Sequence, residues 1–377
     1  MRRSPDQRDD DRLLREGARR FLEERCAWTP APPPAAAQDA LGREMAQLGW
    51  LGLGLPESLG GAGADALQCL TIIEEAGRVL LRRSLAADVL VVPRLMRDGP
   101  AGLARLAPGL AAGDVRFALV PEGPGGIRVT RTSGGLRLTG RSALSLDAGS
   151  ATHWLVEAGG PSPNGATLLC LEALGPAVES RRLIDGRLID GRLGAVLAFE
   201  SLDLPAEAVL ATGHDALARM AEIRDCAVAA LVADAYGALA AGLDLTVGYL
   251  NQRRQFGQTL GSFQAVQHLM ADAFCDLETL RSLLLWTAAA LEGEPGERRR
   301  AASAAKIALG REGLAAASRL IQASGGIAMT EDYRVGHVYK RLQVAAGLHG
   351  GTEAEIRKLA TATLSPEGRR DDEAGAA

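Results

Sequence analysis

This chain of 377 residues contains few aromatic residues, only a small excess of negative over positive charge, and few long apolar runs. Phe, Trp and Tyr together supply 4% of the sequence, although apolar residues reach 47% and charged residues 23%, an ordinary globular balance. The formal net charge is −4, so no basic surface is expected to attract nucleic acid or an anionic membrane. Arg, Asp or Gly interrupts every apolar stretch before about 18 residues, which predicts no membrane-spanning helix.

The five cysteines and five histidines show no pattern that would build a metal or disulfide site. The chain contains no Cys-x-x-Cys pair, and no histidine stands at metal-ligand spacing from a cysteine. The first residues, MRRSPDQRDDDRLL, have no apolar run behind their basic positions, which does not fit a secretory signal. We therefore expect no metal, reduced thiols and a cytoplasmic protein.

Several common motifs for nucleotides and nucleophiles are also missing. No G-x-G-x-x-G follows a strand pattern, and neither a P-loop nor a G-x-S-x-G elbow is present. A Rossmann dinucleotide site, a P-loop nucleotidase and an α/β hydrolase are therefore not expected.

The spacing of apolar residues changes twice along the sequence. Helical spacing of apolar residues gives way to short β-rich pieces between 115 and 210, and long helical periods follow. At this length two or three domains are expected. The predicted fold is mainly α with a central β domain: an N-terminal helical domain (1–113), a small antiparallel barrel or sandwich (114–212), a C-terminal four-helix bundle (213–363) and a disordered tail (364–377).

The four long helical periods have alanine-rich interiors suited to close antiparallel packing. They cover residues 216–251, 262–292, 298–324 and 352–363. In the β region, Arg182–Leu193 reads RLIDGRLIDGRL, a tandem duplication that predicts a lengthened hairpin because it is too short to be a structural repeat.

Four segments carry the most specific motifs. They read LGLPESLGGAGAD at 53–65, YLNQRRQFGQTLGSFQAVQHLMADA at 249–273, QASGGIAMTEDYRVGHVYKR at 322–341 and GGTEAEI at 350–356. In combination they resemble the acyl-CoA dehydrogenase family over roughly residues 10–363, and that family has the same helix–β–helix order. The resemblance implies FAD as cofactor, an acyl-CoA or acyl-carrier thioester as substrate, an electron-transfer flavoprotein or similar acceptor, and a homo- or hetero-oligomer.

The resemblance also implies contacts to the cofactor. Arg253 matches an arginine that clamps the FAD pyrophosphate from a neighbouring subunit, where a planar guanidinium gives paired, charge-assisted hydrogen bonds. From the sequence alone, an arginine beside Arg254 near a helix end is more often a solvated charge. The other implied cofactor residues are Phe256, Gln264, Gln322, Gly325, Gly326 and Thr352.

The glutamate that removes the substrate α-proton in most members of the family is missing. Gly350 stands where that glutamate precedes Gly-Thr. A second family position, 29 residues before Phe256, holds Ala227. Neither side chain can accept a proton.

Two other residues are candidates for a relocated base. Asp234 lies seven residues after Ala227 and, at about 100° per residue, on nearly the same helix face. Its small apolar neighbours predict a raised pKa, which suits a base, and the alternative is a polar residue at a helix or subunit contact. His349 is the weaker candidate, since imidazole can take a proton near neutral pH but a histidine beside Gly-Gly is more often structural.

Two loops of the β region depart from the family pattern. The loop Pro121–Gly126 lacks hydroxyls that normally face the flavin and the thioester, and ALSLD at 143–147 lacks the aromatic residue often packed on the flavin. The chain keeps the bundle residues that the resemblance assigns to FAD and lacks those near the reacting centre. In this respect it resembles the smaller subunit of two-subunit enzymes in the family. Three functions stay open: an acyl-thioester dehydrogenase, a non-catalytic FAD-binding or scaffold subunit, and a flavin monooxygenase or oxidase on the same fold.

Overall fold

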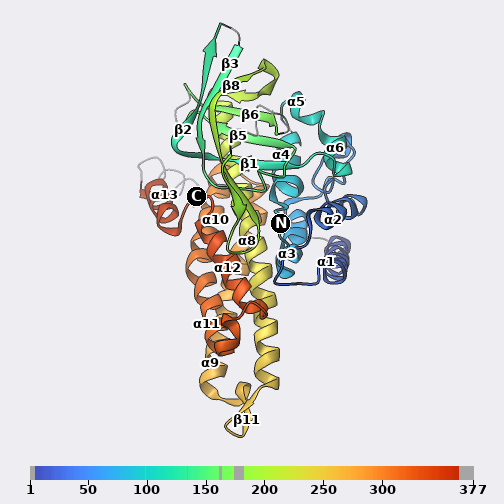
Figure 1. The fold of residues 1–377 in the computed structure, drawn as a ribbon, viewed down its shortest axis with the longest axis vertical. Coiled ribbons are helices and arrows are strands. Elements are labelled where there is room, and N and C mark those ends of the chain that lie inside the picture. Colours follow the sequence, from blue (N-terminus) through green and yellow to red (C-terminus); the bar gives the residue numbers. More distant parts are fainter. Residues whose placement is uncertain (1–4, 98, 134, 161–163, 174–181, 365–377) are drawn as a thin grey trace.

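The computed structural model describes residues 5–97, 99–133, 135–160, 164–173 and 182–364. A long helical bundle forms the axis of the molecule (Figure 1). The β region covers one end of this axis, the N-terminal helices lie against its side, and a small β10–β11 hairpin marks the opposite end. This arrangement confirms the predicted fold class, a mainly helical chain with a central β domain.

The N-terminal region is helical. Its elements are α1 (Pro5–Arg25), α2 (Ala35–Gln47), η1 (Glu57–Leu59), α3 (Ala66–Arg78), η2 (Ala86–Val91), α4 (Val92–Arg97), α5 (Ala101–Ala104) and α6 (Ala107–Ala112). Helix α3 begins with a capping box, because the Asp65 carboxylate accepts the Gln68 backbone N–H and the Gln68 side chain accepts the Asp65 N–H. This cap fixes the start of the N-terminal helix that packs against the bundle.

The β region consists of two sheets. Its strands are β1 (Phe117–Val120), β2 (Glu122–Thr132), β3 (Gly135–Ser142), β4 (Ser145–Leu146), β5 (His153–Ala158), β6 (Thr167–Glu172), β7 (Arg182–Arg187), β8 (Leu193–Leu204) and β9 (Val209–Thr212), with η3 (Ala206–Ala208) before β9. One sheet has the order β1-β5-β6-β9, and the other has the order β2-β3-β8-β4 with β7 paired to β8. The buried side chains of Trp154, Val156 and Phe199 belong to the shared core of these sheets.

Two features refine the predicted β region. Strands β1 and β5 pair in parallel, in contrast to the all-antiparallel prediction, because the chain leaves β1 for the other sheet before it returns as β5. The tandem duplication forms the β7–β8 hairpin, as predicted, and residues 188–192 form its tip.

We propose the domain division that the sequence predicts, since its boundaries fall between α6 and β1 and between β9 and α8. The predicted tail lies almost entirely outside the described residues.

The C-terminal region contains the long helices. They are α8 (Gly213–Gln252), α9 (Gln264–Leu291), α10 (Pro295–Ala308), α11 (Leu314–Ser324), α12 (Arg334–Gly347) and α13 (Thr352–Leu364). Between them lie β10 (Arg254–Gln255), β11 (Gln258–Thr259), η4 (Leu260–Ser262), η5 (Leu309–Gly313) and η6 (Gly325–Met329). Helix α12, absent from the predicted set, packs on α8 within the bundle, whereas α13 packs on α10 at the side of the bundle (Figure 1).

Helix α8 is the centre of the bundle. By length and composition it could cross a membrane, but 89% of its most apolar window is buried inside the molecule, as in the core helix of a globular protein. It approaches α3 very closely through two glycines. A Cβ atom on Gly237 would fall on the carbonyl oxygen of Glu74, and one on Gly77 would fall on the carbonyl oxygen of Asp234. The N-terminal region can therefore dock on the bundle only while these positions lack side chains.

We expect the substitution Gly237→Ala to lower the free energy of unfolding by about 1–3 kcal/mol, because the added methyl group forces α3 and α8 apart. Gly248→Ala is the matched control, since it lies on the same helix and a Cβ there meets no atom within 4 Å. That control should be neutral or should stabilise the protein by up to about 1 kcal/mol through helix propensity. Equal unfolding midpoints for the two variants in urea would contradict the close contact.

Candidate functional site

Two adjoining cavities lie where the β region, α8 and the end of α12 meet. The outer cavity has a volume of about 930 Å³, and the inner cavity has a volume of about 50 Å³. They share the wall residues Leu119, Leu144, Leu348 and His349. Gly350 lines the outer cavity and Ala227 lines the inner one, so both positions where the family resemblance leads us to expect the glutamate lie at these cavities.

The backbone at Gly350 does not favour a side chain. Its φ is +101°, and a Cβ there would lie 3.1 Å from Oε1 of Glu355. The Glu355 carboxylate is buried and bound by Arg224, Lys358 and Ser303. Burial alone would raise the pKa of Glu355, but the hydrogen bonds and charges of Arg224 and Lys358 hold it below its usual value. The carboxylate beside Gly350 is therefore committed to ion pairs.

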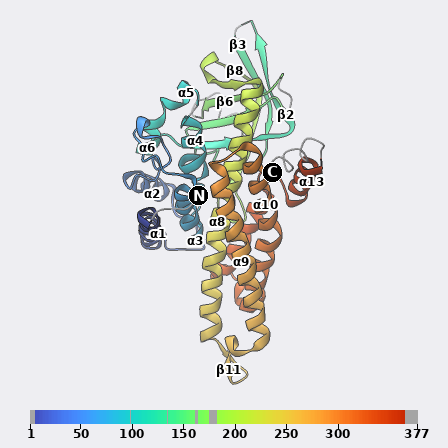
Figure 2. The same cartoon turned by 180° about the vertical axis from the view of Figure 1, so that it is seen from behind.

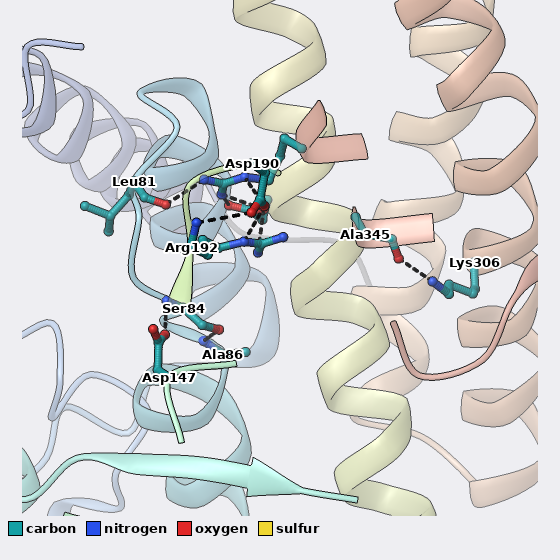
Figure 3. A network of polar contacts seen from close by, with 10 residues as sticks. Leu81, Ser84, Ala86, Asp147, Asp190, Arg192, Lys306 and Ala345 are labelled. Carbon is teal, nitrogen blue, oxygen red and sulfur yellow. Dashed lines mark hydrogen bonds and ion pairs between the residues drawn. The ribbon is translucent and has the colours of Figure 1, made fainter. Parts of the chain in front are cut away.

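Asp234 is held in a buried charge network with Asp190, Arg192 and Arg341. Arg341 Nη1 donates to the two Asp234 oxygens at 2.8 and 3.0 Å, and Arg192 Nη1 donates to Oδ2 at 3.4 Å. Asp190, at the hairpin tip, pairs with Arg192 Nε at 2.6 Å and with Arg341 Nε at 3.1 Å. Figure 3 shows Asp190 and Arg192 beside the carbonyl of Leu81, which accepts from Arg341 Nη2. These ion pairs favour the contact role of Asp234 over a base role.

The cofactor residues implied by the sequence lie mostly at the β10–β11 end of the bundle, far from the β region (Figure 2). Arg253 directly follows α8, and the nearby Phe256 is 90% exposed with a left-handed φ of 51°. Exposed residues also stand at the start of α9 and at the end of α11, namely Gln264, Gln322, Gly325 and Gly326. A contact between Tyr249 and Tyr333, with ring centroids 5.9 Å apart, connects the end of α8 with the start of α12.

Thr352 does not join this group. It begins α13 near the cavities, and a Cβ on Gly310 would fall on its hydroxyl oxygen. The structure thus separates the predicted cofactor residues into an exposed set at the β10–β11 end and Thr352 beside the cavity.

Comparison with known proteins identifies the family of this chain. The N-terminal domain of acyl-CoA dehydrogenases matches residues 8–114, and the C-terminal domain matches residues 227–364. The chain belongs to the acyl-CoA dehydrogenase family. Members of this family are oxidoreductases, and FAD is their cofactor.

Two relatives illustrate the similarity in sequence. Acyl-CoA dehydrogenase FadE34 of Mycobacterium tuberculosis is 29% identical over 331 residues, which cover 86% of this chain but 42% of that protein. Acyl-CoA dehydrogenase IpdE2 of Mycolicibacterium smegmatis is 26% identical over 362 residues, with 93% of this chain and 98% of that protein covered.

Two solved structures illustrate the similarity in fold. A variant of the Tcur3481-Tcur3483 steroid ACAD has a TM-score of 0.80 at 28% identity, covering 98% of this chain and 99% of that one. The ChsE4-ChsE5 complex from Mycobacterium tuberculosis has a TM-score of 0.82 at 22% identity, covering 94% and 98% of the two chains.

The residues at the β10–β11 end of the bundle and the residues beside the cavities differ in how many side-chain groups are available to bind FAD. At the β10–β11 end, Arg253 makes no side-chain hydrogen bond within the described chain, and Phe256 is exposed, so both can meet a group that another chain carries. Beside the cavities, two polar side chains are bound to the backbone of the chain itself. Ser145 Oγ donates to the Leu119 carbonyl, and Asp147 accepts the Ser84 N–H at 2.7 Å. The distal set fits FAD better than the set beside the cavity.

His349 lies at the boundary of the two cavities, with a left-handed φ of 54°. Burial and the nearby charges of Lys306 and Arg224 lower its pKa to about 4, so the imidazole is neutral near pH 7. Lys306 holds this loop in place, because its Nζ donates to the carbonyls of Ala345 and Ala346 at the end of α12. Burial lowers the pKa of Lys306 to about 7.

The outer cavity is also lined by a carboxylate that no motif marks. Glu157 stands on β5, and burial together with the charge of Glu122 raises its pKa to about 7. Glu122 itself accepts the backbone N–H groups of Ile127 and Gly160, each at 2.9 Å. A glutamate in the otherwise apolar end of the strand HWLVEA is the sequence signal that could have identified this position.

We expect His349 to make the protein acid-sensitive. Its folded-state pKa of about 4 lies below the ordinary value of 6.5, so its contribution to stability is present above pH 6.5 and is lost as the pH falls towards 4. Compared with His349→Asn, which tolerates a left-handed backbone, the wild type should lose on the order of 2–3 kcal/mol between pH 7 and pH 4. Urea unfolding at a series of pH values measures this difference.

The control for this experiment is His268→Asn, which changes an exposed histidine on α9. It should follow the wild-type pH dependence. Parallel pH profiles for the wild type and His349→Asn would show that the His349 imidazole is not shielded from solvent protons.

Proposed function

We propose that this chain is one subunit of a two-chain acyl-CoA dehydrogenase and supports the α,β-dehydrogenation of an acyl thioester. In this enzyme the partner subunit, and not this chain, supplies the base. The main supporting observation is that Gly350 and Ala227 both face the cavities, while Asp234 is bound by two guanidinium groups. Two similar structures are named as pairs of proteins, Tcur3481-Tcur3483 and ChsE4-ChsE5, which supports a partner chain.

In this proposal the exposed end of the bundle reaches a cofactor seated largely on the partner. Arg253 binds the pyrophosphate, since a guanidinium gives two charge-assisted hydrogen bonds to a diphosphate, and Gly325 and Gly326 allow the backbone to approach. FAD supplies the hydride acceptor for the substrate Cβ, and an electron-transfer flavoprotein or similar protein reoxidises it. The base that removes the α-proton comes from the partner.

A self-sufficient dehydrogenase is the second candidate. Glu157 favours it, because a carboxylate with a pKa near 7 on a cavity wall has the proton affinity of a general base. Its place on β5 differs from both family positions of the base.

We expect Arg253→Ala to lower the FAD content of the assembled protein and to leave the helical content unchanged. Loss of the charge-assisted contact is worth about 1.5–3 kcal/mol, or more than about tenfold in affinity. Flavin absorbance of the purified protein and circular dichroism measure the two quantities.

The matched control is Arg254→Ala, which removes the neighbouring exposed guanidinium, whose Nη2 donates to the Gly257 carbonyl at 3.3 Å. Its flavin content should stay close to that of the wild type. Equal FAD content in the two variants would remove Arg253 from the cofactor site.

Expressed alone, the chain should reduce a dye acceptor with acyl-CoA at least about 10²-fold more slowly than together with a partner homologue that carries Glu before Gly-Thr. Gly350→Glu should not restore turnover to the single chain, because of the left-handed backbone and the Glu355 carboxylate at 3.1 Å. Stopped-flow reduction of flavin under anaerobic conditions measures each rate.

Two variants of the single chain decide between the candidates if it does turn over. Loss of the rate in Glu157→Gln would support a self-sufficient enzyme, and loss in Asp234→Asn would restore Asp234 as the base. In the two-chain assembly, Asp234→Asn should slow flavin reduction by less than about tenfold, well below the effect of removing a base.

A further inference from the structure

The inner cavity ends in polar groups although much of its wall is apolar. Ile73 and Ala76 of α3 and Ala230 and Leu231 of α8 form apolar parts of the wall. The charged side chains that line it, together with the imidazole of His349, are those of Arg83, Asp147, Arg192 and Asp234. A volume of about 50 Å³ is large enough for a small polar group, since one water needs about 10–15 Å³ on this measure.

Arg192 brings an unused hydrogen-bond donor to this cavity. Its side chain is 2% exposed, its Nε donates to Asp190, and its Nη1 donates to Asp234. Its Nη2 is buried and has no hydrogen-bond partner among the residues that the structure describes. A buried guanidinium N–H without an acceptor is costly, so an acceptor in the cavity would be bound favourably.

Asp147 provides an acceptor in the same cavity. It adopts a left-handed φ of 58°, and its Oδ2 accepts the Ser84 N–H at 2.7 Å, as Figure 3 shows. Burial raises the pKa of Asp147 to about 6, so the carboxylate is mostly ionised near pH 7 and accepts hydrogen bonds. Strained backbone at a cavity wall is typical of functional positions.

The charges around the inner cavity disfavour an anion. Arg83 is already paired with the buried Asp88 at 2.6 Å, and the network of Asp190, Arg192, Asp234 and Arg341 has no net charge. A carboxylate entering the cavity would meet the charges of Asp147 and Asp234, and the Nη2 group of Arg192 is the buried cavity-wall donor that has no partner among the described residues. A hydroxyl group meets no such penalty, because it can accept from Arg192 and donate to Asp147 at once.

The geometry points to a subsite for a hydroxyl group at the distal end of the acyl chain, where Arg192 Nη2 donates to its oxygen and Asp147 accepts its hydrogen. This inference rests on the proposed function, since the acyl thioester must enter through the outer cavity. Arg187, Arg224 and Lys358 line that cavity and suit the phosphates of the thioester carrier. The acyl chain then passes the wall that the two cavities share to reach the inner one.

Calorimetric titration of the purified assembly with straight-chain acyl-CoA thioesters tests the subsite. Each length is used in three forms, with a terminal methyl, hydroxyl or carboxylate group. At the length that reaches the inner cavity, we expect the hydroxyl form to bind at least about tenfold more tightly than the methyl form. The carboxylate form should bind no better than the methyl form.

Arg192→Lys should abolish the preference for the hydroxyl form, because a lysine keeps the charge of the network but not the forked Nη2 donor. Arg141→Lys makes the same change at an exposed position of β3 that lines neither cavity, and it should keep the ratio of the two affinities. If Arg192→Lys does not fold, Ala230→Val narrows the inner cavity from α8 and should also remove the preference.

Equal affinity of methyl and hydroxyl forms at every length would overturn the subsite and leave the proposed function intact. The same holds for a crystal structure of the hydroxyl complex in which only water occupies the inner cavity. Failure of every acyl-CoA to bind the assembly would overturn the proposed function and the subsite together.

Discussion

The structure depends on the placement of one buried arginine. Arg341 of α12 is fully buried and contacts Asp190 of the hairpin tip, Asp234 of α8 and the carbonyl of Leu81 in the N-terminal region. Each of these groups comes from a different part of the fold. Because buried ion pairs repay their desolvation only when the geometry is good, such a network specifies an arrangement more than it adds stability. It fixes the hairpin tip against the bundle, and thereby places Arg192 on the wall of the inner cavity.

The candidate site residues lie in two places, in the cavities beside the β region and at the exposed β10–β11 end of the bundle. The cavities lie between the β region and the bundle, where polar groups such as Ser145 and Asp147 are bound to the chain's own backbone. The opposite end presents Phe256, with 90% of its surface exposed, and Arg253, whose guanidinium has no partner in the described residues. An exposed aromatic residue beside an unpaired guanidinium is available to bind a group that a second chain carries. The asymmetry supports a subunit that contributes to its partner's cofactor site.

The order of the regions could be predicted because periodicity reports local structure directly. Helix α12 was not predicted, although Val335, Val338 and Leu342 have the spacing of one buried helix face. The expectation that Asp234 could act as a base was based on neighbours on the same helix. The residues that surround this carboxylate, Arg192 and Arg341, lie far from it in the sequence, the second at a separation of 107 positions. Contacts between residues so far apart in the sequence depend on how the domains pack, and they cannot be predicted from the residues near each partner.

The backbone and the packing around Gly350 disfavour a glutamate at this position. Glu355 occupies the space beside Gly350, and its ion pair with Arg224 joins α13 to the first half of α8. A glutamate at position 350 would need both a left-handed backbone and the displacement of this carboxylate, two separate costs. The same segment is therefore unsuited to holding a base and suited to closing the cavity. In the proposed function, a chain built in this way shapes and lines the substrate pocket, while a group of the partner chain removes the α-proton.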